Sequence, residues 1–395
     1  MGNDIKRKNR GNISTIQLTD VTFYAAGNFS NGAALVQAFL PAYGYAAYLP
    51  AGINVQVIHH AAHNETLQHN NIRHIFFKGR NGFSYIPFKT LGYIKQQQPH
   101  IVLVQGLGFP VQVIMLRLWL GSKAIIVAQH HAERPYRGIK RWFQQVADKC
   151  INAYLFTAGK NAEEWFNERI ITNAAKYHQL LELSTYFMPV NKQQARAALG
   201  MGDADIFLWV GRLEANKDPL TVLRGFEKYV AVNNNAVLYM VYQKDNLLAE
   251  VKAILQANPA LQQKVVLAGK KNRDELPAWF SAADYYLSGS HREGSGTALI
   301  EAMACGCIPV VTNIAAFNAI TYDGLFGLRY TAGDADSLFT SLCTLPSINK
   351  HEMKAGILKH FEEELSFKAI ANRLSSICTK LLEKKNNASY TQQEE

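Results

Sequence analysis

Two glutamates and two cations on separate loops are the residues of this chain whose types and spacing could do chemistry. Glu293 stands in a glycine-bearing loop, and Glu301 follows eight residues later inside an apolar run that predicts a short helix. Upstream, Arg212 and Lys217 share another loop, between a predicted strand and a predicted helix. Cations bind phosphate groups, and carboxylates accept hydrogen bonds from hydroxyl groups. Together the four side chains predict a pocket for a ligand that is both a diphosphate and a polyol, such as a sugar nucleotide.

The loop that contains the two cations leads into a helix. Asp218 is placed to cap this helix and Pro219 to be its first residue. Arg212 and Lys217 then stand beside a helix N-terminus, where unpaired N–H groups and the helix dipole favour an anion. Two exposed cations on a surface loop are the ordinary alternative. Their assignment to a phosphate site therefore depends on the loop that contains Glu293.

The loop before Glu301 has the composition of a phosphate cradle. Gly294 and Gly296 allow a ligand to approach the backbone closely, and the first N–H groups of the helix, around Ser295–Ala298, lack partners within it. Glu301 lies about one turn further along and can reach ribose hydroxyls, whereas Glu293 can reach the sugar at the other end of the diphosphate. A solvated acid is the alternative for each glutamate, but an unpartnered carboxylate among apolar residues is costly.

Short β-rich runs alternate with amphipathic helical stretches, and the pattern restarts after the segment Met188–Gly202. Continuous apolar strands between helices predict parallel sheets covered on both faces. A chain of 395 residues is also long enough for two cores. The expected fold class is α/β, with two Rossmann-like, doubly wound parallel-sheet domains that face each other across a cleft. Ligands bind such sheets at the carboxyl ends of the strands.

The expected domain boundaries follow from this pattern. Residues 1–190 are expected to form a basic N-terminal domain on the acceptor side, and residues 191–360 a C-terminal nucleotide-sugar-binding domain. Residues 361–385 are expected to form a C-terminal helix that can cross back to the N-terminal domain. Residues 386–395 are polar and are expected to form a disordered tail.

The net charge of +10 lies entirely in the first half of the chain. Residues 1–190 contain 19 Lys and Arg against 9 Asp and Glu, whereas residues 191–395 contain 22 of each. This asymmetry favours an anionic partner, either the surface of a membrane or an acidic acceptor, with a solubilising surface as the alternative. Nucleic acid is not expected, because the basic residues are scattered and form no recognisable binding module.

No targeting or membrane-spanning segment is expected. The longest apolar stretch, Val111–Ala128, contains Arg117 and Lys123, and the basic N-terminus has no apolar segment behind it. The expected location is cytoplasmic, with peripheral contact on the inner face of the membrane.

The coupled motifs of the second half resemble a known family. Gly211-Arg-Leu-x-x-x-Lys217 and Glu293-Gly-Ser-Gly-x-Ala-Leu-Ile-Glu301-Ala-Met-Ala-x-Gly are similar to those of the retaining, GT-B-fold glycosyltransferases of family 4, the glycosyl transferases group 1. The resemblance implies that Arg212 and Lys217 bind the donor diphosphate, Glu301 the ribose and Glu293 the transferred sugar. Further donor contacts would come from Gly294, Ser295, Gly296 and Thr297. The base would be recognised near residues 269–273.

Two segments of the first half also fit the family. Gln129-His130-His131-Ala-Glu133 ends a strand where family members often carry a histidine that faces the transferred sugar. His130 is the better match, with His131 or Glu133 as alternatives, and a polar loop that caps the next helix as a further one. A possible donor loop follows the first strand and contains Gly27, Asn28 and Gly32, although the adjacent glycine pair usual in the family is absent.

The predicted function is transfer of a sugar from a nucleotide-diphosphate donor to an acceptor hydroxyl, with retention of the anomeric configuration, in polysaccharide or glycoconjugate synthesis. The donor would be a UDP-, GDP- or ADP-sugar, and the acceptor a saccharide or a lipid-linked sugar. With two cations at the diphosphate, no metal or other cofactor is expected, and the Asp-x-Asp sequences at residues 203–205 and 334–336 are expected to be structural. The alternatives are a sugar-nucleotide epimerase of the same fold and a basic protein that binds nucleic acid or a membrane surface.

Overall fold

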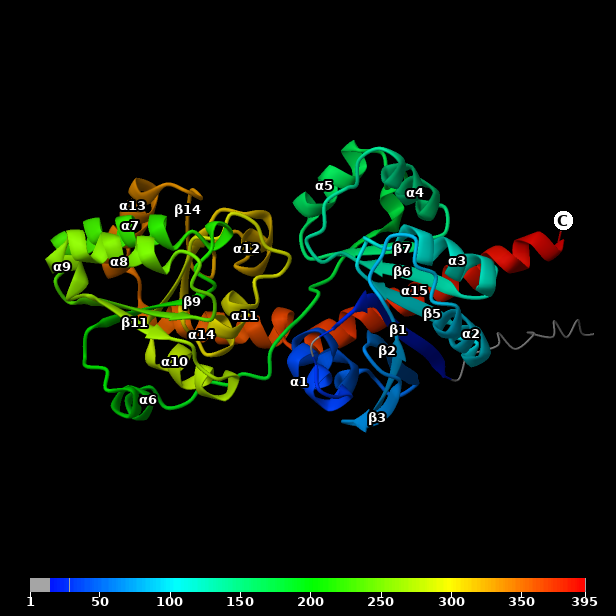
Figure 1. The fold of residues 1–395 in the computed structure, drawn as a ribbon, viewed down its shortest axis with the longest axis horizontal. Coiled ribbons are helices and arrows are strands. Elements are labelled where there is room, and N and C mark those ends of the chain that lie inside the picture. The colour runs from blue at the N-terminus through cyan, green and yellow to red at the C-terminus, as the bar shows by residue number, and fades with distance from the viewer. Residues whose placement is uncertain (1–14, 28, 395) are drawn as a thin grey trace, which may run out of the picture.

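The computed structural model describes residues 15–27 and 29–394, with side chains placed as far as Asn387. Two α/β units lie side by side along the long axis of the molecule, each built around one sheet (Figure 1). The segment after β8 and the helices at the end of the chain connect the two units (Figure 1). The prediction of two doubly wound units is therefore confirmed.

The first unit contains an eight-stranded sheet in the order β3-β4-β2-β1-β5-β6-β7-β8. All neighbouring strands are parallel except β3 and β4. The strands are β1 (Ile16–Ala25), β2 (Ile53–Ala61), β3 (Glu65–His69), β4 (Ile72–Lys78), β5 (Ile101–Gln105), β6 (Ile125–Gln129), β7 (Ala153–Phe156) and β8 (Tyr177–Gln179). The helices are α1 (Gly32–Tyr43), α2 (Phe88–Gln97), α3 (Pro110–Leu120), α4 (Ile139–Asp148) and α5 (Gly159–Asn167). Every residue of β5, β6 and β7 is buried, as expected for strands covered by helices on both faces.

The second unit contains a six-stranded, fully parallel sheet in the order β11-β10-β9-β12-β13-β14. Its strands are β9 (Asp205–Gly211), β10 (Ala236–Tyr242), β11 (Val265–Gly269), β12 (Tyr285–Ser288), β13 (Ile308–Thr312) and β14 (Leu328–Tyr330). The helices are α6 (Lys192–Leu199), α7 (Pro219–Val232), α8 (Leu248–Ala257), α9 (Pro259–Gln262), α10 (Leu276–Ala282), α11 (Thr297–Ala304), α12 (Ala315–Ile320), α13 (Ala335–Cys343) and α14 (Lys350–His360).

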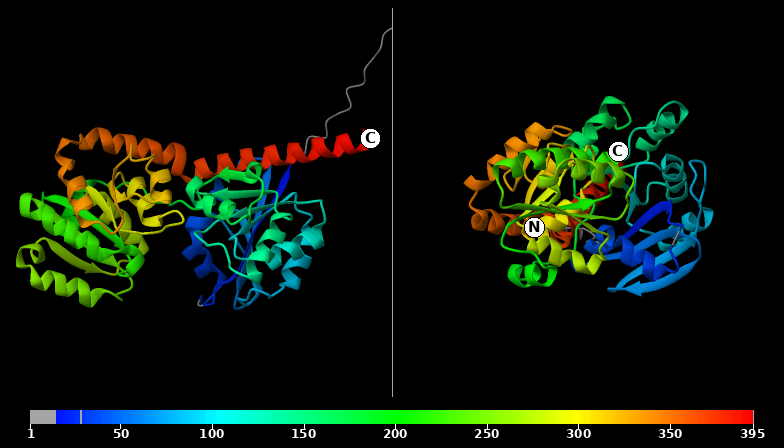
Figure 2. Two further views of the ribbon diagram at one scale, coloured as in Figure 1. Left: turned by 90° about the horizontal axis from the view of Figure 1, so that it is seen from above. Right: turned by 60° about the vertical axis from the view of Figure 1, so that its left-hand side comes forward.

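The chain returns to the first unit at its end. A π-helical turn (Phe361–Leu365) follows α14, and α15 (Phe367–Glu394) then runs along the first unit (Figure 2). The ring centroid of Phe367 lies 4.5 Å from that of Tyr186 and 6.2 Å from that of Tyr48. The helix continues to Glu394, through residues for which the sequence predicts no regular structure, because extending a helix costs far less than starting one.

The apolar run Val111–Ala128 forms most of α3 and then most of β6, as expected for a buried helix and strand. Across residues 15–27 and 29–394, no helix is both long enough and apolar enough to cross a membrane.

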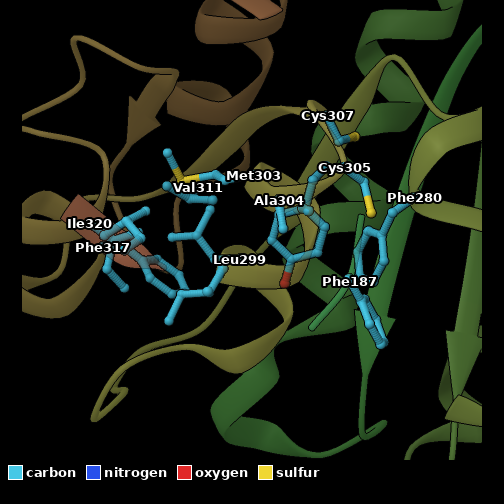
Figure 3. Close-up of a cluster of buried hydrophobic side chains, with 14 of the residues drawn as sticks. Phe187, Phe280, Leu299, Met303, Ala304, Cys305, Cys307, Val311, Phe317 and Ile320 are labelled. Carbon is cyan, nitrogen blue, oxygen red and sulfur yellow. The ribbon is translucent and has the colours of Figure 1, made fainter. Parts of the chain in front are cut away.

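Apolar packing fixes the helix that carries Glu301. Leu299 lies beside Phe317 and Ile320 of α12, whereas Phe187 and Phe280 pack together nearby (Figure 3). The buried apolar residues of α11 are Leu299, Ile300, Ala302, Met303 and Ala304. Because most of the helix is buried, the direction of the Glu301 side chain is set by the core of the second unit.

Candidate active site

A pocket of about 360 Å³ lies at the carboxyl ends of β9, β10, β11 and β12. The predicted site residues among those that line it are Arg212, Lys217, Glu293, Gly296, Thr297 and Glu301. The structure thus brings the two motifs of the second half together in one pocket. A larger pocket of about 530 Å³ between the two units contains none of the predicted site residues.

Both helices that border the pocket begin where the sequence predicts. The Asp218 carboxylate accepts a hydrogen bond of 3.1 Å from the N–H group of Thr221, and Pro219 is the first residue of α7. Gly296 precedes α11 with a φ of +67°, and a Cβ atom there would lie 2.5 Å from Cε1 of Phe317. Only glycine fits this position, so the N-terminus of α11 opens onto the pocket without a side chain at residue 296.

The charged side chains of the pocket form ion pairs. Lys217 pairs with Glu293, which joins the two motifs directly. Nη2 of Arg273 lies 2.8 Å from Oε1 of Glu301, and Nη2 of Arg212 lies 2.8 Å from Oε1 of its neighbour Glu214. An anionic ligand bound in this pocket would replace these carboxylates as the partner of the basic side chains.

Glu301 is the most buried of these acids. Its side chain is only 4% exposed, and burial raises its pKa from 4.5 to about 7, although the Arg273 guanidinium opposes the shift. The guanidinium of Arg273 also lies 4.9 Å from the ring centroid of Phe187. Arg273 follows β11, in the turn where the base of a nucleotide is expected, but the sequence alone did not single it out.

The loop before α11 docks on the first unit. The Ser295 hydroxyl forms a hydrogen bond of 3.0 Å with the Thr157 hydroxyl. Nη2 of Arg292 donates to the carbonyl groups of Ala132 (3.3 Å) and Glu133 (3.2 Å). The side chain of Ser295 therefore faces the first unit. A bound nucleotide sugar would have to contact Ser295 through its backbone.

His130, predicted to face the transferred sugar, has its side chain buried within the first unit. Its side chain is only 2% exposed, its Nε2 donates to the Glu133 carbonyl (3.0 Å), and its ring stacks on Phe156 with centroids 4.7 Å apart. Burial lowers the pKa of His130. The chain turns at Ala132, with a φ of +65°, and neighbouring side chains point in opposite directions, so His130 faces inward.

His131, the alternative, lies between the two units. Its Nε2 lies 2.7 Å from Oε1 of Gln105, and its Nδ1 lies 2.9 Å from Oε2 of Glu182. Gly294 of the second unit lies beside Glu182. Of the two histidines, His131 is therefore the one that the fold brings toward the loop containing Glu293.

The described residues of the possible donor loop, Gly27 and Gly32, lie apart from the pocket lining. Asn28 lies outside the described residues. Gly27 has open space where a Cβ atom would stand, and the N–H group of Gly32 donates to Oε2 of Glu65 (2.8 Å). Neither Gly27 nor Gly32 lines the pocket that contains the other predicted residues.

The Asp-x-Asp sequences have structural partners. Asp205 pairs with Lys350 at 2.6 Å, and the Asp334 carboxylate caps α13 by accepting from the N–H groups of Asp336 and Ser337, both at 2.9 Å. In the described part of the chain, no group of three or more His, Cys, Asp or Glu side chains could hold a metal ion.

Comparison with solved structures defines the fold class. The chain is similar to a glycosyltransferase of Rickettsia africae (TM-score 0.71, 15% identity, covering 93% of this chain and 99% of the other). It is also similar to a sucrose-phosphate synthase of Thermosynechococcus elongatus (TM-score 0.69, 17% identity, 93% and 100%) and to HepE of Anabaena in complex with UDP (TM-score 0.69, 13% identity, 92% and 100%). The chain therefore has the GT-B fold, as predicted.

Comparison of sequences supports the enzyme class. Residues 204–347 match the family described as glycosyl transferases group 1. The chain is 26% identical over 212 residues to a D-inositol 3-phosphate glycosyltransferase of Thermobispora bispora, covering 50% of this chain and 48% of that protein. It is 24% identical over 263 residues to a GDP-mannose:cellobiosyl-diphosphopolyprenol alpha-mannosyltransferase of Xanthomonas campestris, covering 65% and 66%.

A third relative is a UDP-Gal:alpha-D-GlcNAc-diphosphoundecaprenol alpha-1,3-galactosyltransferase of Escherichia coli, 24% identical over 212 residues and covering 52% of this chain and 54% of that protein. The chain spans about half to two thirds of the length of these three relatives. Together with the family match, they support the prediction of a transferase of the glycosyltransferase class.

Proposed function

We propose that this protein is a glycosyltransferase that moves a sugar from a nucleotide-diphosphate donor to a hydroxyl group of an acceptor. The observation that carries the proposal is the joint pocket of Arg212, Lys217, Glu293 and Glu301 at the N-terminus of α11. The comparisons favour neither the epimerase nor the nucleic-acid-binding alternative.

In this proposal the donor diphosphate replaces the carboxylates that now pair with the cations. It takes the place of Glu293 beside Lys217 and accepts hydrogen bonds from Arg212 and from the first N–H groups of α11. Negative charge grows on the diphosphate as the sugar leaves, so these fixed donors stabilise the transition state more than the ground state. Because two cations serve the leaving group, the proposed reaction needs no metal.

Glu301 and Glu293 contact the two sugars of the donor in this scheme. Glu301 is proposed to accept hydrogen bonds from the ribose, and Glu293, released from Lys217, from the transferred sugar. Gly294, Ser295, Gly296 and Thr297 add backbone or hydroxyl donors. We propose a retaining reaction in which the donor phosphate accepts the proton of the acceptor hydroxyl, because this scheme assigns Glu301 to the ribose and Glu293 to the hydroxyl groups of the transferred sugar, which leaves neither glutamate as a nucleophile.

The acceptor is proposed to be a saccharide or a lipid-linked sugar, in polysaccharide or glycoconjugate synthesis. The names of two relatives specify diphosphate-linked polyprenol acceptors, and their donors are UDP-Gal and GDP-mannose. The base and sugar of the donor of this chain follow from neither name, so UDP-, GDP- and ADP-sugars are all to be tested.

We also propose cytoplasmic, peripheral contact with an anionic membrane through the first unit. Residues 66–147 contain eleven Lys or Arg residues and a single acid, Glu133. Leu118 of α3 and Ile139 and Trp142 of α4 are exposed, and α3 and α4 pack against each other. Exposed apolar side chains on a stretch of the chain with a large excess of basic residues suit the surface of an anionic bilayer. Binding to vesicles with phosphatidylglycerol but not to pure phosphatidylcholine, weakened by Trp142→Ser, would support the contact; equal binding to both would contradict it.

A thermal-shift screen of UDP-, GDP- and ADP-sugars tests the main proposal, because a ligand that binds only the folded protein raises the melting temperature. Glu293→Ala should then lower turnover of the best donor more than it lowers donor binding. A wild-type protein that binds none of these donors would contradict the proposed function, and full turnover by the variant would contradict the role of Glu293.

A further inference from the structure

A continuous set of polar contacts runs from the middle of the first sheet to Glu182, which lies beside the second unit. It starts at Asp20 of β1, which is fully buried. Oδ2 of Asp20 accepts from the Tyr45 hydroxyl at 2.5 Å, and both carboxylate oxygens accept from Nε2 of Gln105 at 2.9 Å. The contacts then continue from Gln105 to His131 and from His131 to Glu182.

These contacts determine the protonation of His131. A carboxylate only accepts hydrogen bonds, so Asp20 holds the NH2 group of Gln105 and leaves the Gln105 oxygen for His131. Nε2 of His131 must therefore donate to that oxygen, while Nδ1 lies 2.9 Å from Oε2 of Glu182. A proton on Nδ1 as well, which a carboxylate at this distance favours, makes the ring an imidazolium. Burial alone would lower the pKa of His131, but Glu182 and the other nearby carboxylates raise it overall.

The far end of this network lies at the loop that carries Glu293. Glu182 follows β8, and its side chain is only 7% exposed. A Cβ atom at residue 294 would lie 2.6 Å from Oε1 of Glu182, so only a glycine lets the carboxylate stand this close to the loop. Burying three charged groups, Asp20, His131 and Glu182, together with the polar side chains of Tyr45 and Gln105 is costly unless each is paired. A contact between Glu182 and Gly294 that served only to hold the two units together would not need a buried network of charged and polar side chains behind it.

We propose that Glu182, held beside His131 and Gly294, is a further sugar-binding residue of the cleft, whose carboxylate accepts hydrogen bonds from sugar hydroxyl groups. The inference rests on the proposed function for its ligand. A hydroxyl group that contacts the backbone at Gly294 also lies within reach of Glu182, next to Glu293. The hydroxyl can belong to the transferred sugar or to the acceptor, and the measurements below separate the two sources.

The first test measures the charge of His131 without any substrate. Nitrogen NMR of 15N-histidine-labelled protein, with His131→Gln to assign the signals, should show both ring nitrogens protonated at pH 7.5. Glu182→Gln should lower the pKa of His131, so that the ring is neutral at the same pH. The other titratable groups around the ring, Glu133, Asp20, His130 and Arg292, are unchanged in this variant. A neutral His131 in the wild-type protein at pH 7.5 would overturn the inference.

The second test compares ligands in the wild-type protein, in Glu182→Gln and in the control Glu168→Gln, whose exposed carboxylate pairs with Arg141 on the first unit. The free nucleoside diphosphate should bind all three proteins alike. If Glu182 holds the transferred sugar, Glu182→Gln should lose roughly tenfold or more in affinity for the sugar nucleotide, as expected for a hydrogen bond to a charged group. If it holds the acceptor, donor binding and donor hydrolysis should stay unchanged and the KM for the acceptor should rise by a similar factor.

Unchanged donor affinity, donor hydrolysis and acceptor KM in Glu182→Gln would also overturn the inference. Thermal unfolding shows whether Glu182→Gln is folded. If it is not, Glu182→Asp, which keeps the charge, is compared with Glu182→Ala instead. Stronger sugar binding by the Asp variant than by the Ala variant then supports the inference, and equal binding contradicts it. A wild-type protein that binds no sugar nucleotide contradicts the proposed function instead, and the NMR measurement still decides the state of His131.

Discussion

Replacing Glu301 by glutamine should stabilise the protein in a way that depends on pH. In the folded protein the pKa of Glu301 is raised from 4.5 to about 7, mainly by burial. The unfolded chain therefore binds fewer protons than the folded one between these values, and stability falls as the pH rises through this window. The cost of keeping Glu301 in the fold reaches about 3 kcal/mol at pH 8, against about 1 kcal/mol at pH 5. A neutral glutamine of similar shape removes this cost.

Urea denaturation at both pH values measures the effect. The free energy of unfolding of Glu301→Gln minus that of the wild-type protein should be about 2 kcal/mol larger at pH 8 than at pH 5. A matched variant, Glu214→Gln, changes a more exposed carboxylate, the partner of Arg212, and should show no comparable trend. If the difference for Glu301→Gln is the same at both pH values, the buried, costly carboxylate inferred from the structure is refuted. Glu301→Gln should also bind the donor more weakly. That result would show that the stability lost by burying the Glu301 carboxylate serves donor binding.

Three further predictions concern the pocket and its surroundings. Lys217→Ala should weaken binding of a nucleoside diphosphate roughly 10- to 100-fold in calorimetry, and unchanged affinity would contradict its role. Gly296→Ala should destabilise the protein by about 1–3 kcal/mol in urea denaturation, since φ is +67° and Cβ would meet Phe317; an unaffected midpoint would refute the packing. Asp334→Ala should lower the free energy of unfolding by about 1 kcal/mol, because it removes a helix cap, and should keep donor binding; lost donor binding would contradict the structural role of this Asp-x-Asp sequence.

Local rules were sufficient for the framework of the site. The N-cap at Asp218, the proline that follows it and the glycine before α11 are each set by short-range chemistry, so the sequence located both helix starts. Once two parallel sheets are predicted, the motifs after β9 and β12 must meet at the carboxyl edge of one sheet, because these strands are neighbours. The pocket of Arg212, Lys217, Glu293 and Glu301 follows from that topology.

Contacts that depend on the tertiary fold were not visible in the sequence. Ser295 and Thr157 are 138 residues apart. Gln105, His131 and Glu182 meet only because they lie at or after the carboxyl ends of β5, β6 and β8, which belong to the same sheet. His130 and His131 differ in direction because of the turn at Ala132, whose positive φ no local signal predicts. The sequence also gives no clear signal for the strands β3, β8 and β14. They have three to five residues each and no long apolar run.

The crystal structure of the protein with an unreacted sugar nucleotide tests the central claim most directly. The account predicts the diphosphate between Arg212 and Lys217 at the start of α11, the ribose hydroxyls on Glu301, and the sugar beside Glu293 and Gly294. A donor bound elsewhere, or bound here with Lys217 still paired to Glu293 and Glu301 still paired to Arg273, would contradict it.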